Sequence, residues 1–246
     1  MLGDPDQTED APMTWTVYHR ATRSPTYGFI HGILLVLLYE GLRWTAGAHG
    51  VRVGAEVWMW QGLAVVGLRG VAALAVAVGC VAALVWWAER GRQVPLRWDV
   101  ASLVVAESGL YAVVGAALVS GTVGLVLGQW APGGGALGTR LALSVGAGVY
   151  EELVFRVLLV GGLAWTLRHL MARRGWAYPL AALIGALVFS AVHYLGPMGD
   201  AFALASFTFR FLFGLVLNGL FLWRGFAVAA WTHALYNVFL TLGLLG

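Results

Sequence analysis

The chain has 246 residues and a formal net charge of +3, with 60% hydrophobic residues and only 11% charged residues. Soluble globular proteins are about 45–50% apolar and about 25% charged, so this chain has too little charge to cover a water-facing surface. The composition excludes intrinsic disorder, a nucleic-acid-binding domain and a disulfide-stapled secreted module. It predicts an all-α fold, a polytopic transmembrane helical bundle whose outer face meets membrane lipid.

Polar and apolar segments divide the chain into three parts. Residues 1–26 are polar and predict a cytosolic N-terminal tail, because they lack the basic start and immediate apolar core of a signal peptide. Residues 27–138 predict transmembrane helices without a recognised motif, and residues 139–246 contain the polar clusters described below. Seven apolar runs in these two parts are long enough to cross a bilayer core of about 30 Å: 27–45, 69–88, 99–129, 139–170, 180–196, 201–223 and 226–245.

Residues 51–68 are ambiguous, since Glu56, Gln61 and two tryptophans interrupt an otherwise apolar run. They predict an interfacial or re-entrant piece, with an eighth span as the alternative. With seven spans, nine arginines fall on the N-terminal side of the membrane and four on the other. Because cytoplasmic loops carry the excess of positive charge, the N-terminus is predicted to be cytoplasmic. Arginine replaces lysine throughout, which favours a GC-rich genome and a bacterial inner membrane.

Small residues recur at the spacing that lets membrane helices approach closely. Ser120, Gly124 and Gly128 are four residues apart, and Ser144 and Gly148 repeat the interval. Both sets predict tightly packed helix faces.

Ionisable residues inside membrane helices cost at least about 2.5–3.5 kcal/mol to insert, so they point to function by default. The densest group is VYEELVFR at residues 149–156. Glu152 and Arg156 are four residues apart, share one helix face and are predicted to pair. Glu151 lies about 100° around the helix from Glu152 and is left free for chemistry. A buried ion-pair network that serves only helix packing is the alternative.

Two histidine motifs follow on separate predicted helices. Phe189 and His193 are four residues apart in FSAVH. His233 and Asn237 are four residues apart in HALYN. Counted along their spans at about 1.5 Å per residue, Glu151 and both histidines fall near the middle of the bilayer. They are therefore predicted to converge on one water-filled pocket.

A carboxylate and an imidazole that lie close together can deprotonate a water molecule. A second histidine and an asparagine amide supply donors for a developing oxyanion, so the set predicts peptide hydrolysis by activated water, without a cofactor. Glu151, His193 and His233 could instead ligate a divalent metal such as zinc, although the sequence has no HExxH motif. The rival interpretation is a non-proteolytic membrane protein, a transporter or an immunity partner that binds a peptide without cutting it.

These motifs, in this order, resemble those of the CPBP family of intramembrane proteases, which includes the CAAX prenyl endopeptidases and the bacterial Abi-type proteins. The motifs are EExxxR, FxxxH and HxxxN, formed here by Glu151, Glu152, Arg156, Phe189, His193, His233 and Asn237. The resemblance covers residues 139–246 and implies that this part of the chain is a catalytic transmembrane core.

The resemblance implies a glutamate-type intramembrane endopeptidase that cuts a membrane-anchored protein or peptide. Glu151 would be the general base, and His193 would help to activate the water. His233 and Asn237 would form the oxyanion site, and the supporting residues would be Glu152, Arg156 and Phe189. Substrates differ within the family. Eukaryotic members cut after a prenylated cysteine, many bacterial members act in peptide maturation or bacteriocin immunity, and the myxosortase branch is associated with C-terminal sorting signals of surface proteins.

Two further ionisable residues, Glu107 and Arg210, fall inside predicted spans but outside the motifs. They are expected to pair with each other across helices, with a contact between Arg210 and a substrate carboxylate as the alternative. A structural ion pair is the favoured interpretation.

Overall fold

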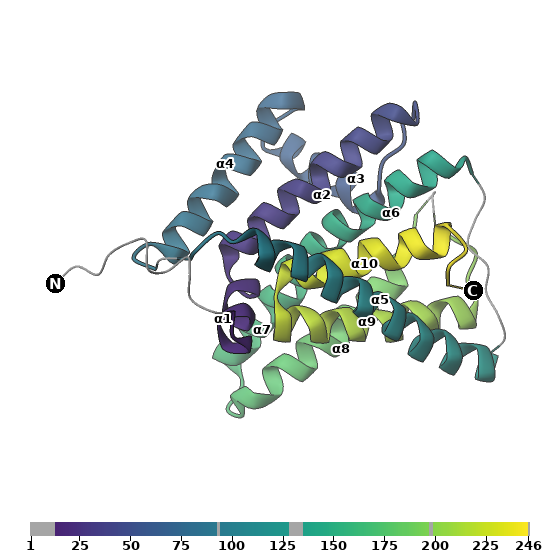
Figure 1. Cartoon of the computed structure of the whole chain (residues 1–246). Coiled ribbons are helices and arrows are strands. Elements are labelled where there is room, and N and C mark those ends of the chain that lie inside the picture. The colour runs from purple at the N-terminus through teal and green to yellow at the C-terminus, as the bar shows by residue number, and fades with distance from the viewer. Residues whose placement is uncertain (1–12, 93, 128–134, 197–198, 246) are drawn as a thin grey trace.

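The computed structural model describes residues 13–92, 94–127, 135–196 and 199–245, and every regular element within them is helical (Figure 1). The predicted all-α helical bundle is thereby confirmed. The elements are α1 (Trp15–Thr22), α2 (Pro25–Thr45), α3 (Gly54–Val65), α4 (Gly70–Glu89), α5 (Trp98–Leu127), α6 (Leu137–Glu152), η2 (Leu153–Gly161), α7 (Gly162–Leu170), η3 (Arg174–Trp176), α8 (Ala177–Val192), α9 (Leu204–Arg224) and α10 (Phe226–Thr241). Gly128 and the first 12 residues of the predicted tail lie outside the described residues.

Within the described ranges, five helical segments are long and apolar enough to cross a membrane: Pro25–Thr45, Ala72–Glu89, Trp98–Gly124, Arg174–Val192 and Leu204–Arg224. The predicted span at 139–170 is a continuous run of α6, η2 and α7, and the one at 226–245 contains the 16-residue α10. The total of seven spans stays a prediction. α3 has 12 residues, a rise of about 18 Å, which is too short for a full span and agrees with an interfacial or re-entrant piece.

The helix α10 lies at the centre of the bundle and packs against α5, α6 and α9 (Figure 1). α2 packs on α6, and α8 packs on α9. The segments that carry the predicted motifs therefore lie together, since α10 contacts α6 and η2 contacts α8, although they are far apart in the sequence.

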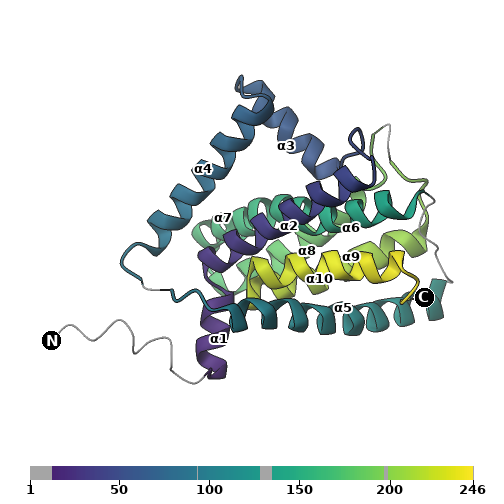
Figure 2. The same cartoon turned by 45° about the horizontal axis from the view of Figure 1, so that its top comes forward.

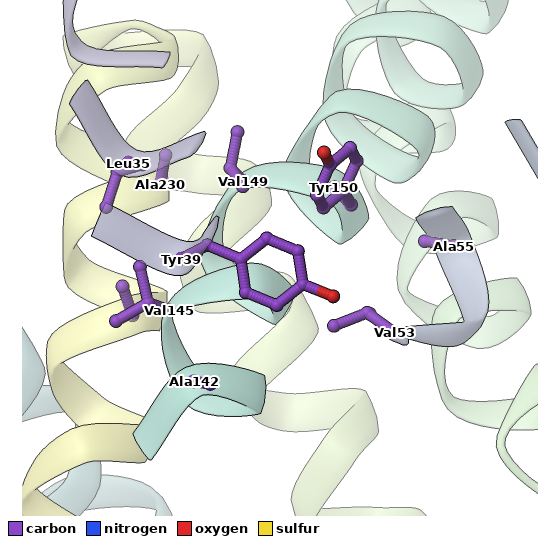
Figure 3. Packing of buried hydrophobic residues seen from close by; sticks show 10 residues of the cluster. Leu35, Tyr39, Val53, Ala55, Ala142, Val145, Val149, Tyr150 and Ala230 are labelled. Carbon is purple, nitrogen blue, oxygen red and sulfur yellow. The ribbon is translucent and has the colours of Figure 1, made fainter. Parts of the chain in front are cut away.

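A cluster of buried apolar side chains joins α2, α6 and α10. In Figure 3 the Tyr39 ring of α2 lies below Val149 and Tyr150 of α6, with its hydroxyl towards Val53. The Tyr39 hydroxyl donates to Oε2 of Glu56 at 2.6 Å, and Arg52 pairs with the other oxygen of that carboxylate. Glu56, which the sequence suggested as an interfacial group, is fully buried and is compensated by these two partners and by the indole N–H of Trp60, which donates to its Oε1 atom at 3.0 Å.

Glycine sets the distance between α6 and α10. A Cβ atom at Gly148 would lie 2.5 Å from Cβ of Ala234 and 2.7 Å from the carbonyl oxygen of Ala230. The two helices therefore touch where no larger side chain fits, which confirms the packing predicted from Ser144 and Gly148. The same prediction is wrong at Gly124, where a Cβ atom would meet no described atom within 4 Å.

The long helix that carries the two glutamates changes geometry directly after them. Leu153–Gly161 is a π-helix, η2, between α6 and α7. In a π-helix the hydrogen bonds run between residues five apart, which widens the helix, and such segments are rare and frequent at functional sites. The sequence predicted one helix over 139–170, and nothing in its pattern marks this widening.

Part of the predicted polar tail is folded. α1 packs against α5 and brings the Tyr18 hydroxyl to 2.6 Å from Oε2 of Glu107. Burial, and then the hydrogen bond to Glu107, raise the pKa of the Tyr18 phenol, so it remains a donor. Arg224 lies 2.6 Å from the same carboxylate oxygen, and this cluster fixes α1 to the membrane helices.

The expected ion pair between Glu107 and Arg210 is therefore wrong. Both arginines belong to α9, but they are 14 residues apart, a separation of about 21 Å along a helix, and it is Arg224 that reaches Glu107. Arg210 instead lies 2.5 Å from Asp200, with its guanidinium 5.2 Å from the centre of the Tyr194 ring.

The helices α3 and α4 project from the rest of the bundle as a V (Figure 2). Only 11% of the apolar segment Ala72–Glu89 is buried inside the protein, compared with 39% of Leu204–Arg224. α4 thus presents nearly its whole apolar surface outwards, as expected for a helix that faces lipid.

Candidate active site

Three helices bring the predicted motifs together. Glu151 and Glu152 are the last residues of α6, His193 directly follows the end of α8, and His233 lies in α10. The close contact of α6 and α10 at Gly148 lies one turn before the glutamates, so it fixes the distance between the carboxylates and His233. His193 terminates its helix rather than lying within a longer one, as the predicted span 180–196 implied.

The Glu151 carboxylate lies between the two imidazoles. Its Oε2 atom is 4.0 Å from Nε2 of His193 and 3.9 Å from Nε2 of His233. The exposed fractions of the three side chains are 16%, 24% and 5% for Glu151, His193 and His233 respectively, so the group is sheltered but not fully enclosed. These distances are too long for direct hydrogen bonds, and polar atoms so spaced are commonly joined by one water.

The other ring nitrogen of each histidine is already occupied. Nδ1 of His193 lies 2.7 Å from the carbonyl oxygen of Phe189, and Nδ1 of His233 lies 2.7 Å from Oε1 of Glu152. Because a carbonyl and a carboxylate only accept, we assign the proton of each neutral ring to Nδ1. Both Nε2 atoms then present a lone pair towards Glu151.

Glu152 has a different role from its neighbour. It is fully buried, and its Oε1 atom lies 2.9 Å from Nη1 of Arg156 and 2.7 Å from Nδ1 of His233. The predicted pair of Glu152 and Arg156 is present, although its geometry is that of a close ion pair and not of an aligned hydrogen bond. The bond from His233 to Glu152 was not predicted, because it joins residues 81 positions apart on separate helices.

Phe189 lies at the meeting point of these groups. Its ring packs edge-to-face with those of His193 and His233, at centroid distances of 5.0 and 6.0 Å. The Arg156 guanidinium lies 4.3 Å from the Phe189 centroid, within the range of a cation–π contact. A Cβ atom at Gly214 would come 3.1 Å from the Phe189 ring, so Gly214 makes the space that the ring occupies. Phe189 therefore packs against both imidazoles.

Asn237 lies on α10 one turn beyond His233 and is half-buried. Within the described part of the chain, no hydrogen bond of its side chain is found, which leaves its amide available to a ligand. Asn218, another polar residue in a membrane helix, donates from Nδ2 to the carbonyl oxygen of Ala182 at 2.7 Å and has a packing role.

The spacing of the three donors can be compared with that around zinc. Ligand atoms about 2.0–2.2 Å from a tetrahedral zinc ion lie about 3.3–3.5 Å from one another. The distances from Glu151 to the two imidazoles, 4.0 and 3.9 Å, are wider. Among the described residues, no group of three or more His, Cys, Asp and Glu side chains has the arrangement of a metal site. Glu151, His193 and His233 would need to move together to hold a metal.

A helical bundle in which a glutamate faces two histidines resembles the site expected for the CPBP class of intramembrane proteases. Residues 134–239 match the family model of the Rce1-like type II CAAX prenyl endopeptidases, so this part of the chain is similar to that family. The match includes all seven motif residues. The comparisons with curated proteins and with solved structures gave no match.

The family is a protease family that acts on membrane-associated proteins. Its match and the apolar helices together identify the chain as an integral membrane protein. The first 133 residues, including the V of α3 and α4, lie outside the matched segment.

Proposed function

We propose that the protein is a glutamate-type intramembrane endopeptidase, which hydrolyses a peptide bond of a membrane-anchored protein or peptide with an activated water molecule. The observation that carries the proposal is the position of the Glu151 carboxylate, about equally far from the Nε2 atoms of His193 and His233. The family match supports it, since the matched family consists of endopeptidases.

The water-activating step follows from the proton assignments. A water placed between Glu151 and His193 would donate one hydrogen to the carboxylate and one to the free Nε2 lone pair. Glu151 takes the proton as the water attacks the scissile carbonyl carbon, and it returns that proton to the leaving amine. The hydrogen bond from His193 to the Phe189 carbonyl holds the imidazole with Nε2 towards the water.

The developing oxyanion would be stabilised by His233 and Asn237. The neutral Nδ1–H form of His233 cannot donate from Nε2, so in this role the ring takes up a second proton from solvent before the oxyanion forms. Oε1 of Glu152, 2.7 Å from Nδ1, accepts from Nδ1–H and keeps Nε2 turned towards the site, as the buried acid of a catalytic triad orients its histidine. The Asn237 amide supplies a second donor. Glu152 and Arg156 thus act on the reaction through His233.

The substrate proposed is a peptide segment held at the membrane by a lipid or by its own helix. The enzyme would lie in a bacterial inner membrane with its N-terminus in the cytoplasm, as the excess of arginine on that side indicates. Reporter fusions at the two termini would test the orientation. A reporter active only in the periplasm, when fused to the N-terminus, would reverse it.

The decisive variant is Glu151→Gln in the full chain, reconstituted in liposomes and assayed with a panel of lipid-anchored peptides that includes a prenylated CAAX peptide. We expect kcat to fall by about 10²–10⁴-fold, the usual contribution of a general base. The control is Glu40→Gln, which changes a half-exposed carboxylate paired with Arg43 outside the site. Turnover retained by Glu151→Gln would remove Glu151 from the mechanism.

Chelation separates the water mechanism from a zinc-dependent one. We expect exhaustive dialysis against a chelator to leave at least half of the activity, because the donors are spaced wider than in a tetrahedral zinc site. A loss that added zinc restores, together with bound zinc in elemental analysis, would establish the metal alternative.

The transporter interpretation predicts a different result. Proton-coupled flux of a solute in liposomes, without any peptide cleavage, would contradict the protease proposal and assign the same buried groups to a proton relay.

A further inference from the structure

A cavity lies between α1, the start of α2 and the segment that follows α4, far along the chain from the catalytic motifs. Its volume is about 870 Å³, and its lining includes Trp15, Arg20, Arg23, Glu89, Arg92 and Pro95. Of the charged side chains in the lining, three are arginines and one is a carboxylate. The cavity therefore carries a net positive charge.

The three arginines are available to a ligand. Within the described part of the chain, no ion pair, hydrogen bond or ring contact is found for the side chains of Arg20, Arg23 and Arg92. The single carboxylate is engaged elsewhere, because Oε2 of Glu89 accepts from the backbone N–H of Thr26 at 3.0 Å and from the hydroxyl of the same residue. Glu89 is buried and ties α4 to the start of α2.

The first turn of α2 does not supply the anion-binding groups. Its Tyr27 N–H donates to the Ser24 hydroxyl, and its Thr26 N–H donates to Glu89. The recognition of an anion would therefore rest on the guanidinium groups, which bind phosphate oxygens in a planar, two-point manner.

The position of the cavity identifies the kind of anion. α2 begins, α4 ends and α5 begins around it, and all three contain candidate membrane spans. Two exposed tryptophans lie at the same end of these helices, as in the aromatic belt at a membrane surface. The exposed fractions are 58% for Trp15 and 89% for Trp98. The cavity thus lies where lipid headgroups are, and its volume exceeds that of a phosphate group alone.

We propose that this cavity is a binding site for the headgroup of an anionic phospholipid, with Arg20, Arg23 and Arg92 around the phosphate. Apolar lining residues such as Trp15 and Pro95 would contact the glycerol and the first carbons of the acyl chains. A lipid there would bridge α1, α2 and α4, and would hold the lipid-facing α4 by its end. The site is independent of the proposed proteolysis.

The test uses the full chain in detergent, titrated with phosphatidylglycerol or phosphatidylcholine and observed by native mass spectrometry. We expect tighter binding of phosphatidylglycerol. Each arginine near a membrane surface contributes about fivefold to the affinity for anionic lipid. The triple variant R20Q/R23Q/R92Q should therefore weaken binding by about a hundredfold.

The matched control is R168Q/R173Q/R174Q, which removes the same number of charges from α7 and the turn after it. It should change the affinity by less than about threefold, since only long-range attraction is reduced. Equal loss in both triple variants, or equal binding of the two lipids by the unmodified chain, would overturn the proposal. Displacement of phosphatidylglycerol by millimolar inorganic phosphate would assign the cavity to a free anion instead of a lipid.

Discussion

Two regions of the protein differ in where their charged side chains lie. Around α6, η2, α8 and α10, charged side chains lie inside the protein, and both Glu152 and Arg156 are fully buried. In the V of α3 and α4, the apolar segment of α4 is only 11% buried, and its one charged residue, Glu89, lies at its end, where it accepts hydrogen bonds from Thr26. Substitutions should therefore matter far more in the first region, where protein surrounds each side chain, than in the second, where lipid does.

The largest expected effect is that of Arg156→Met. It would leave Glu152 buried without its cation, and removal of one partner of a buried pair costs about 3–5 kcal/mol. Unfolding of the full chain in bicelles with a denaturing detergent would measure the loss. The double variant E152Q/R156M should recover most of it, because no uncompensated charge remains. A single variant as stable as the double would contradict the assigned pair.

A smaller effect is expected from Gly148→Ala, because the added methyl group would lie 2.5 Å from Cβ of Ala234. Overpacking of this kind costs about 1–3 kcal/mol, and parting α6 from α10 would also lower kcat by moving the glutamates away from His233.

The matched control is Gly79→Ala in α4, where a Cβ atom would meet no described atom within 4 Å. It should leave activity unchanged and stabilise the helix by about 0.5–1 kcal/mol. Equal effects of the two glycine variants on activity would show that the contact of α6 and α10 does not position the site.

The smallest expected effects are those of two leucine substitutions. Leu217→Ala in α9 removes a fully buried side chain, and Leu84→Ala in α4 removes one that is 64% exposed. In a membrane the transfer term largely cancels, since lipid is as apolar as leucine, and mainly the cavity term remains. We expect a loss of about 1–2 kcal/mol for Leu217→Ala and less than about 0.5 kcal/mol for Leu84→Ala. The midpoint of thermal unfolding in nanodiscs would report both, and an equal shift would mean that α4 packs against protein.

The sequence predicted the part of the site that lies within single helices. The interval of four residues between Glu152 and Arg156, or between Phe189 and His193, is a helical neighbour relation that periodicity reveals. The order of the motifs led to the family, and Gly148 indicated a close contact. These features are local, and local geometry is the same wherever a helix forms.

Contacts between helices were not predictable from the same signals. The bond from His233 to Glu152 depends on how α6 and α10 are rotated about their axes, which no interval within one helix records. The prediction that Glu107 pairs with Arg210 was wrong for a related reason. Position along α9 decides which arginine can reach Glu107, and Arg224 is the one that does. The prediction of close packing at Gly124 was wrong because a four-residue spacing shows that the side chains on a helix face are small. It does not show whether another helix packs against that face.

The π-helix after the glutamates also changes what a deletion would do. A π turn is commonly equivalent to an α-helix with one inserted residue. Side chains after η2 are therefore rotated by about 100° from where an unbroken α-helix over the same residues would put them. α6 contacts α10, and α7, which continues the same helical segment, contacts α8. Loss of a single residue between Arg156 and Gly161 would return the segment to a regular α-helix and leave α7 facing α8, whereas the same loss within a regular helix would turn the following residues by about 100° to another neighbour.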